Sequence, residues 1–223
     1  MSTCTITARD LARITRAIAP HCHDESAPSL NCVILEAHGD CLIATATDRY
    51  VVASLRLRPE QPPAPDFRAW VPVRAMKRAA ATFRATRHHC PDLLLEVDGD
   101  RLTVATDTLG GPVSGASIVV NLGPPAEDAL RVVRRIVRAA QTASPAATVA
   151  ALDLEILARF VGAQEAGEPV VMWSASGGDD GFGKQKPWAV AVGDDFRAVV
   201  QPVRRDPEAS LSAHAEWAWA VAP

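Results

Sequence analysis

The chain has 223 residues, 48% of them hydrophobic and 22% charged, and its formal net charge is −3. This composition predicts an ordinary packed core and argues against a simple basic nucleic-acid-binding protein. No apolar run approaches the roughly 18 residues that a membrane-spanning helix needs, so no membrane partner is expected. The first residues, MSTCTIT, lack the basic start and apolar core of a signal peptide. Five cysteines, an odd number, suit a reducing compartment better than a disulfide scaffold, so the expected location is cytoplasmic.

Three stretches of the chain have the pattern of one repeated unit, a strand, a helix and then two or three strands. The first copy spans residues 4–58, the second 68–120 and the third 148–205. One such unit cannot bury its own sheet face, so the copies must pack on one another. The proline-rich segment 58–67 is interpreted as a loop within one domain, because each flanking copy alone is too small to be stable.

The predicted helices share one design, an apolar stripe on one face and basic residues on another. Thr7 followed by Asp10 is typical of a capping box at the start of the first helix. The apolar stripes are Leu11, Ile14 and Ile18 in the first helix and Met76, Ala80 and Phe83 in the second. A third amphipathic helix is predicted at residues 126–141, with an apolar face of Leu130, Val133, Ile136, Val137 and Ala140.

Each of these three helices carries a nearly all-basic outer face, although the chain as a whole is acidic. A charge run on a single helix is usually a solvated face. Three such faces favour a focused positive surface that contacts the phosphates of double-stranded DNA without reading bases. The candidate DNA-binding residues are Arg9, Arg13, Arg16, Arg74, Lys77, Arg78, Arg84, Arg131, Arg134, Arg135 and Arg138.

Other residue clusters are interpreted as structural. Residues 21–23 (HCH) and 88–90 (HHC) follow the C-terminal ends of two repeat helices. A pseudo-twofold relation would put these ends on opposite sides of the domain, too far apart for zinc ligands at about 2.0–2.3 Å. Polar loop ends and no metal are therefore expected. Residues 178–184 (GDDGFGK) have phosphate-loop spacing, but two aspartates would repel phosphate and Pro187 prevents a following helix, so a hairpin loop is predicted.

The segments ATATDRYVVAS, AWVPVRAMKRA and KPWAVAVGDDFRAVVQPVRR resemble the bacterial sliding clamp family, the beta subunit of DNA polymerase III. Thr47, Asp48 and Tyr50 match the family's Thr-Asp-x-(His/Tyr)-Arg-Leu turn. The C-terminal signature of the family is an apolar residue, Met, Pro, an apolar residue, Arg and Leu. Residues 200–204 (VQPVR) match its apolar, Pro, apolar and Arg positions, with Gln201 where the family often has Met. The resemblance covers nearly all of residues 1–205 and implies the α+β DNA-clamp fold, in which each domain consists of two βαβββ units.

Clamps of this family have three domains and hence six units, whereas this chain has three units. Residues 1–120 resemble the family's middle domain, and residues 148–205 resemble the C-terminal half of its last domain. Residues 121–147 are then a connector that contains the basic helix, and residues 206–223 are a flexible tail. Three units cannot encircle DNA, so sliding implies a homo-oligomer, for which the open sheet edge of the half domain is one route.

The resemblance also implies a groove that binds partner peptides between the two regions. Such a groove needs an apolar floor, which Met76, Val200 and Val203 would supply, and a few polar groups that fix orientation. The groove residues implied by the resemblance are Thr47, Asp48, Arg49, Tyr50, Val51, Pro72, Met76, Val200, Gln201, Pro202, Val203 and Arg204. The alternative interpretation is that these residues are only strand ends and turns of the fold.

The function implied by the resemblance is that of a non-catalytic, processivity-factor-like accessory protein of DNA replication or repair. Its expected partners are double-stranded DNA, bound without sequence preference, and DNA polymerase or other proteins with clamp-binding motifs. No cofactor is expected, and no spacing in the sequence indicates a nucleophile–base pair. The alternative is an adaptor or decoy that binds clamp-binding peptides without encircling DNA.

Overall fold

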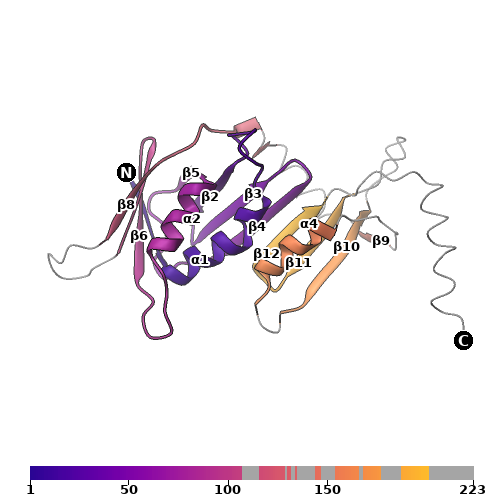
Figure 1. Ribbon diagram of the computed structural model, residues 1–223. Coiled ribbons are helices and arrows are strands. Elements are labelled where there is room, and N and C mark those ends of the chain that lie inside the picture. Colours follow the sequence, from indigo (N-terminus) through magenta and orange to yellow (C-terminus); the bar gives the residue numbers. More distant parts are fainter. Residues whose placement is uncertain are drawn as a thin grey trace, which may run out of the picture.

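A computed structural model describes residues 1–106, 116–128, 130–131, 134, 144–146, 154–165, 168–176 and 187–200 (Figure 1). The first unit contains β1 (Ser2–Thr7), α1 (Ala8–Ala17), η1 (Ala19–His21), β2 (Cys32–His38), β3 (Cys41–Thr47) and β4 (Val51–Leu57). The second contains β5 (Phe67–Pro72), α2 (Val73–Thr82), β6 (Asp92–Asp98), β7 (Arg101–Thr106) and β8 (Ser117–Asn121). The third contains β9 (Ser144–Ala146), α4 (Leu154–Ala158), η2 (Arg159–Ala163), β10 (Val170–Ser176), β11 (Trp188–Val192) and β12 (Phe196–Val200). The predicted loop 178–184 and the predicted tail lie outside the described residues.

The strands form two antiparallel sheets, in the orders β1-β6-β7-β8 and β5-β2-β3-β4-β12-β11-β10-β9. The first two units exchange their first strands, since β1 pairs with β6 of the second unit and β5 pairs with β2 of the first. This exchange ties the two units into one body. Helices α1 and α2 pack against each other, and Figure 1 shows them with α4 on the same side of the sheets.

Local sequence signals explain how α1 begins and which face it buries. The Asp10 backbone N–H donates to Thr7 Oγ1 at 3.1 Å, and the Thr7 backbone N–H donates to Asp10 Oδ2 at 3.0 Å. The predicted capping box is thereby confirmed. Leu11, Ile14 and Ile18 are buried in the main core, as the apolar stripe predicted.

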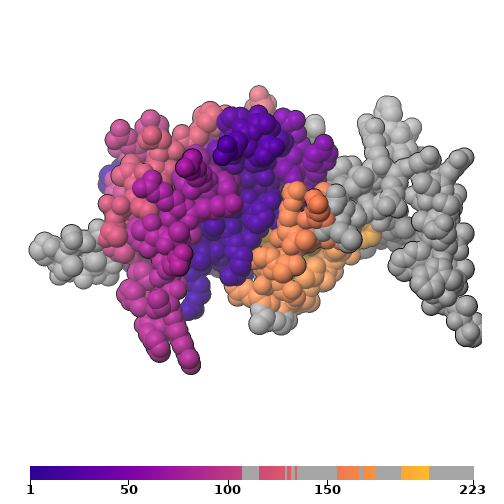
Figure 2. All heavy atoms as spheres, in the orientation of Figure 1, coloured from indigo at the N-terminus to yellow at the C-terminus, as the bar shows by residue number. Residues whose placement is uncertain are grey.

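The third unit joins the first through direct strand pairing. Strand β12 pairs antiparallel with β4, with Phe196 opposite Leu55 and Val200 opposite Val51. One eight-stranded sheet therefore runs from the complete domain into the half domain, by which we mean the described residues from α4 to β12. Figure 2 shows the half domain, in orange, seated directly against the first unit, in indigo.

On the side of the sheet where the helices lie, the packing of η2 on α1 also holds the half domain against the first unit. Element η2 packs on α1 so closely that a Cβ at Gly162 would lie 2.5 Å from the Arg16 carbonyl oxygen. Arg16 Nε also donates to the Gly162 carbonyl at 2.9 Å. The Phe160 ring stacks on His21 with centroids 5.1 Å apart and meets Phe196 edge-on at 6.0 Å. These rings join η1, η2 and β12 in one buried cluster.

The outer edge of the half domain is covered by a short strand from the same chain. Residues 144–146 form β9, which pairs with Ser174–Ser176 of β10. The strand predicted at residues 148–152 lies outside the described residues. The half domain was expected to have an open sheet edge. Within the described residues, β9 covers the edge of β10, so the outermost strand on this side is β9.

Removing the ring of Phe160 should weaken the junction. Phe160 is buried, so Phe160→Ala should lower the free energy of unfolding by about 3–5 kcal/mol through lost contacts and a residual cavity. The neighbouring Val161 is 72% exposed, and Val161→Ala should change it by less than about 0.5 kcal/mol. Urea denaturation of both variants measures the two values, and equal losses would contradict the assignment of Phe160 to the junction core.

Candidate functional site

The turn between β3 and β4 is held by one carboxylate. Asp48 Oδ1 accepts hydrogen bonds from the backbone N–H groups of Tyr50 at 2.9 Å and Val51 at 2.8 Å, and its second oxygen pairs with Arg159 of η2. Arg49 has a φ of +82°, which places it in the left-handed region that this turn requires. The turn therefore presents Tyr50, which is 64% exposed, on a fixed backbone.

A cavity of about 790 Å³, here called the turn cavity, lies beside this turn. Basic side chains come from the start of α2 and from η2, and acidic ones from the η1–β2 loop and the turn itself. The cavity is lined by Ala19, Pro20, Cys22, His23, Asp24, Glu25, Asn31, Asp48, Tyr50, Val73, Arg74, Lys77 and Arg159. Of the predicted groove residues only Asp48 and Tyr50 line it, and its lining is largely charged.

Two of the three residues predicted to form the apolar floor, Met76 and Val200, are buried in the core, and the third, Val203, lies outside the described residues. Val51 and Val200 are 0% exposed and Met76 is 1% exposed, all in the main core beneath the helices. Side chains alternate along a strand, so their neighbours Val52 and Val199 lie on the opposite, outer face of the sheet. Those two valines are direct cross-strand partners, and each is 6% exposed.

The remaining predicted groove residues are distributed between the turn and the end of β5. Thr47 is 8% exposed and its Oγ1 accepts the Arg49 N–H at 3.2 Å, so it supports the turn. Pro72 is half-buried at the N-cap of α2. Gln201, Pro202, Val203 and Arg204 lie outside the described residues.

Helix α2 and the turn that follows it carry four exposed basic side chains that have no partner within the described residues. Arg74, Lys77, Arg78 and Arg84 are exposed, and none of their side chains makes an ion pair or hydrogen bond within the described residues. We call these four residues the α2 basic row. Arg9 at the start of α1 is exposed in the same way.

Two of the predicted DNA-binding arginines on α1 are engaged with the half domain. Arg13 has a side chain only 15% exposed, 3.3 Å from Glu165 and 3.5 Å from Asp195. Arg16 donates to the carbonyl of Gly162 and lies 3.9 Å from Glu165, although its side chain is 55% exposed. Arg13 is therefore a junction residue, which corrects its assignment to an exposed basic face.

The connector lies on the other side of the sheet. Residues 127–128, 130–131 and 134 are helical. Leu130 is buried with Cys32, Ile34 and Trp70 in a second apolar cluster. These three residues alternate along β2 and β5 with residues of the main core, so the cluster occupies the outer face.

Two ion pairs hold the connector on that face. Glu127 lies 3.0 Å from Arg68, and Arg134 pairs with Glu36. The prediction that three basic helices share one surface is therefore wrong, because Arg131 and Arg134 lie across the sheet from α2. Arg135 and Arg138 lie outside the described residues.

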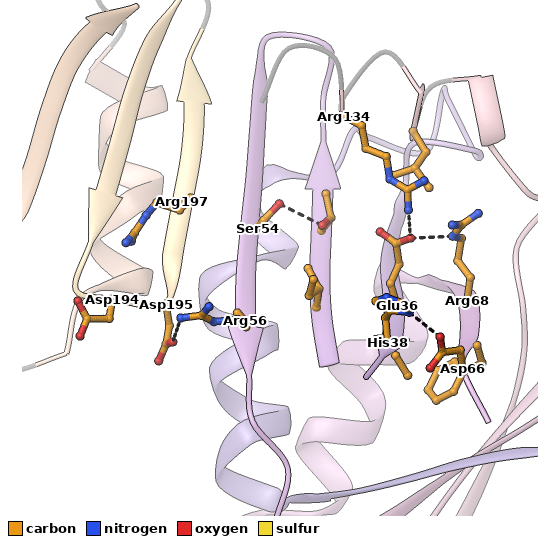
Figure 3. Close-up of a pocket in the computed structure, with 15 residues that line it drawn as sticks. Glu36, His38, Ser54, Arg56, Asp66, Arg68, Arg134, Asp194, Asp195 and Arg197 are labelled. Atoms are coloured by element: carbon orange, nitrogen blue, oxygen red, sulfur yellow. Dashed lines mark hydrogen bonds and ion pairs between the residues drawn. The ribbon is translucent and has the colours of Figure 1, made fainter. Parts of the chain in front are cut away.

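A second cavity, of about 910 Å³, crosses the outer face of the eight-stranded sheet and is here called the outer trough (Figure 3). Its lining comes from the connector, from strands β5, β2, β3, β4 and β12, and from the turns that flank them. The lining residues are Glu36, Ala37, His38, Ile43, Thr45, Ser54, Arg56, Asp66, Phe67, Arg68, Leu130, Arg134, Asp194, Asp195 and Arg197. None of the predicted groove residues is among them, and Arg134 is the one predicted DNA-binding residue that lines it.

Solved structures resemble this arrangement. The beta chain of DNA polymerase III from Streptococcus pneumoniae gives a TM-score of 0.62 at 15% identity, over 92% of this chain and 65% of that one. The Bacillus subtilis sliding clamp gives 0.62 at 12% identity, over 92% and 64%. The Pseudomonas aeruginosa sliding clamp, solved with a ligand, gives 0.63 at 16% identity, over 95% and 67%. This chain has the sliding-clamp fold.

The family resemblance seen in the sequence is thus confirmed for the fold. No family model and no curated protein matches the sequence, so the clamp fold rests on the three-dimensional arrangement. The chain spans 65% of the length of the Streptococcus pneumoniae beta chain and 64% of the length of the Bacillus subtilis clamp. Among the described residues, no helix is long and apolar enough to cross a membrane, and no three His, Cys, Asp or Glu side chains are grouped as metal ligands.

One residue beside the turn cavity was misjudged from its neighbours in the sequence. His21, expected at a polar loop end, is 0% exposed and packs between Phe160 and Phe196. Neither ring nitrogen has a hydrogen-bond partner among the described residues. The pKa of His21 is lowered from 6.5 to about 4, mainly by burial and also by the nearby Arg159 charge, while the Asp48 charge acts in the opposite direction.

The lowered pKa of His21 makes the stability of the junction depend on pH. The unfolded chain binds a proton near pH 6.5 while the folded chain does not until about pH 4, so stability is full above pH 6.5 and falls as the pH drops through this window. The loss should reach up to about 1.4 kcal/mol per pH unit. In His21→Phe, the free energy of unfolding measured with urea should change less with pH between pH 6.5 and pH 4. Parallel curves for the two proteins would contradict a buried neutral His21.

Proposed function

We propose that this clamp-fold chain is a non-catalytic accessory protein of DNA replication or repair that binds duplex DNA without sequence preference. The observation that carries the proposal is the α2 basic row, four exposed cations that lack acidic partners among the described residues. In a chain of net charge −3, charges left unpaired on one helix produce a local positive field. Such a surface supplies phosphate contacts that do not depend on sequence.

The surface differs from the one that the sequence predicted. On α1, Arg9 is also exposed, and Arg16 is exposed in part. Arg13 is used to hold the half domain, and Arg134 binds Glu36 on the outer face. The proposed DNA surface is therefore confined to the helical side, on which α1 and α2 lie together (Figure 1).

Partner peptides are proposed to bind at the turn between β3 and β4. Tyr50 is the largest exposed aromatic side chain among the described residues, and Asp48 fixes the backbone beneath it. The turn cavity extends from Tyr50 to Arg74 and Lys77. An aromatic anchor beside charged groups suits a peptide with both apolar and polar side chains.

A single observation favours the adaptor alternative. The chain has three units, and the single copy spans about two thirds of the length of the clamps it resembles. Encircling DNA therefore requires at least a second copy or another clamp chain, whereas an adaptor requires neither.

Replacing one residue of the α2 basic row should weaken DNA binding at any sequence. Arg78→Gln should raise the Kd for a short duplex and reduce the slope of log K against log salt by about 1, as expected for one lost phosphate contact. Arg131→Gln is the control, because Arg131 is also exposed but lies on the connector across the sheet. Fluorescence anisotropy at several salt concentrations measures both, and equal effects of the two changes would contradict the proposed surface.

Topological retention separates the two modes of action. A closed assembly should remain on nicked circular DNA during gel filtration and be lost after the circle is linearised, whereas an adaptor should elute identically with both. Retention on neither form, together with measurable anisotropy on short duplexes, would leave DNA binding intact and exclude the ring.

Peptide binding at the turn has its own test. A labelled Gln-Leu-x-Leu-Phe peptide should bind with a Kd below about 1 mM, equivalent to about −4 kcal/mol. Tyr50→Ala should weaken binding at least about tenfold if the ring is the anchor. Val119→Ala, at a side chain that is 59% exposed on β8, is the control and should have no effect. Binding that survives Tyr50→Ala would remove the turn from the proposal.

A further inference from the structure

We propose that strand β8 and helix α2 together form a docking site for a partner protein that presents an open antiparallel strand edge with a carboxylate beside it. The proposal goes beyond the proposed function, because it holds whether or not the chain binds DNA. It rests on the free backbone of β8, on the internal repeat of the chain, and on one arginine of the α2 basic row.

Strand β8 is an unprotected sheet edge, unlike the other three edge strands. On β1, Thr3 exchanges two backbone hydrogen bonds of 3.1 Å with Ala64. On β5, the Trp70 carbonyl accepts the Gly123 N–H at 2.7 Å, and β9 is interrupted by Pro145. In the part of the chain that the structure describes, no hydrogen bond reaches the outer side of β8. The strand contains neither proline nor a charged residue, so nothing in it prevents pairing with another strand.

The backbone of β8 shows which groups are free. At its two ends the Ala116 carbonyl accepts a hydrogen bond from β7, and the Leu122 N–H donates to the residue before β7. Bonded positions alternate along an antiparallel pair, so the even-numbered residues of β8 bond to β7. Ser117, Val119 and Asn121 therefore direct their N–H and C=O groups to the open side. Each offers one donor and one acceptor to a further strand.

The last strands of the other two units already pair with each other. Strand β4 ends the first unit, β12 ends the third, and five residue pairs join them antiparallel. Strand β8 ends the second unit, also has five residues, and has no such partner within the described residues. Figure 1 shows β8 and the half domain at opposite ends of the complete domain. A strand from another chain can therefore extend the smaller sheet as β12 extends the larger one.

Helix α2 repeats the arginine that fastens the half domain to α1. Both helices have ten residues, and their fourth residues, Leu11 and Met76, are buried in the main core. Their sixth residues are Arg13 and Arg78. Arg13 lies 3.5 Å from Asp195 at the start of β12, whereas Arg78 is exposed and has no ion pair among the described residues. Arg78 is thus placed to bind a carboxylate at the start of a strand paired with β8.

One strand position differs between the two edges. Counted from the tight turns that precede β3 and β7, Val119 has the place on β8 that Arg56 has on β4. Arg56 lies 3.6 Å from Asp195, so two arginines share that carboxylate at the β4 edge. With Val119 in this place, a partner's carboxylate would be bound by Arg78 alone. The Val119 side chain is 59% exposed, and a neighbouring strand would cover part of it.

Charge favours an acidic partner over a second copy of this chain. Pairing of β8 with β8 of a second copy would bring two α2 helices together, as the pairing of β12 with β4 brings η2 onto α1. Each helix would carry the α2 basic row, and like charges repel. A partner carboxylate instead neutralises Arg78. The other three residues of the row stay exposed, as Arg9 does on α1.

The test uses the full chain and two matched peptides. N-acetyl-GDDFRAVV-amide copies residues 193–200, and N-acetyl-GNNFRAVV-amide has the same shape without the carboxylates. In ¹⁵N NMR titrations the Asp peptide should shift the backbone amides of residues 117–121 with a Kd of about 1–10 mM. The Asn peptide should bind at least about threefold more weakly. Equal binding of the two peptides, or no shift in β8, would overturn the proposal.

Variants of Val119 test the backbone pairing. Val119→Pro removes an N–H that points away from β7, so it should leave the β7 pairing intact and abolish the shifts caused by the Asp peptide. Val119→Thr keeps the N–H and the β-branched shape, and it should bind the peptide nearly as the wild type does. Equal binding by both variants would contradict strand addition at β8.

Variants of the arginines locate the carboxylate. Arg78→Gln should weaken the Asp peptide to the level of the Asn peptide. Arg9→Gln makes the same charge change on α1 and is the control, which should alter neither peptide. Normal binding of the Asp peptide by Arg78→Gln would place the carboxylate elsewhere and overturn the assignment. A wild-type dimer in sedimentation equilibrium that Val119→Pro dissociates would give the edge to a second copy and refute the acidic partner.

Discussion

The pairing of β12 with β4 is the interaction on which the rest of the molecule depends. It supplies the half domain with a hydrogen-bonded edge and places Phe196 against the His21 and Phe160 rings. Without that neighbour, a three-stranded sheet and two short helical segments would have one uncovered face, and burial of apolar surface would be too small to hold them folded. The ion pairs of Arg13 with Glu165 and Asp195 form only because the two regions already touch.

The same pairing separates the molecule into two chemically different sides. On the helical side, α1 and α2 bury apolar stripes and leave the α2 basic row exposed. On the outer side, the connector packs Leu130 on Trp70 and closes one end of the trough. Because adjacent residues of a strand face opposite sides, a ligand on one side and a ligand on the other contact different residues of the same strands.

Local features of this fold were predictable from the sequence, and long-range ones were not. The capping box of Thr7 and Asp10 and the stripe of α1 depend on residues a few positions apart, so the sequence contains the whole signal. The sequence does not show which side chains of β4 and β12 point to the core. Valine occupies two successive positions in each strand, Val51 and Val52 in β4 and Val199 and Val200 in β12. A strand with apolar residues on both faces has no alternation to read.

The misjudged charges and the buried histidine have a common cause. Arg13, Arg134 and His21 each have partners more than 90 residues away in sequence, so spacing within a helix or loop gave no sign of them. Arg13 and Arg16 fall on the side of α1 that meets η2, while the side chains of the α2 basic row make no ion pair with another described element. Of the predicted DNA-binding residues, the α2 basic row and Arg9 are therefore exposed as expected, whereas Arg13 and Arg134 are engaged in ion pairs.

The short strand β9 has a consequence for how copies of this chain can meet. It is three residues long, and its central residue is Pro145, which has no backbone N–H. Within the described residues of β9, the only backbone N–H groups that could pair with another molecule are those of Ser144 and Ala146. Short, proline-containing edges of this kind protect sheets from uncontrolled growth into aggregates. Any ordered self-association through backbone pairing must instead begin from the far end of the long sheet or from the smaller sheet.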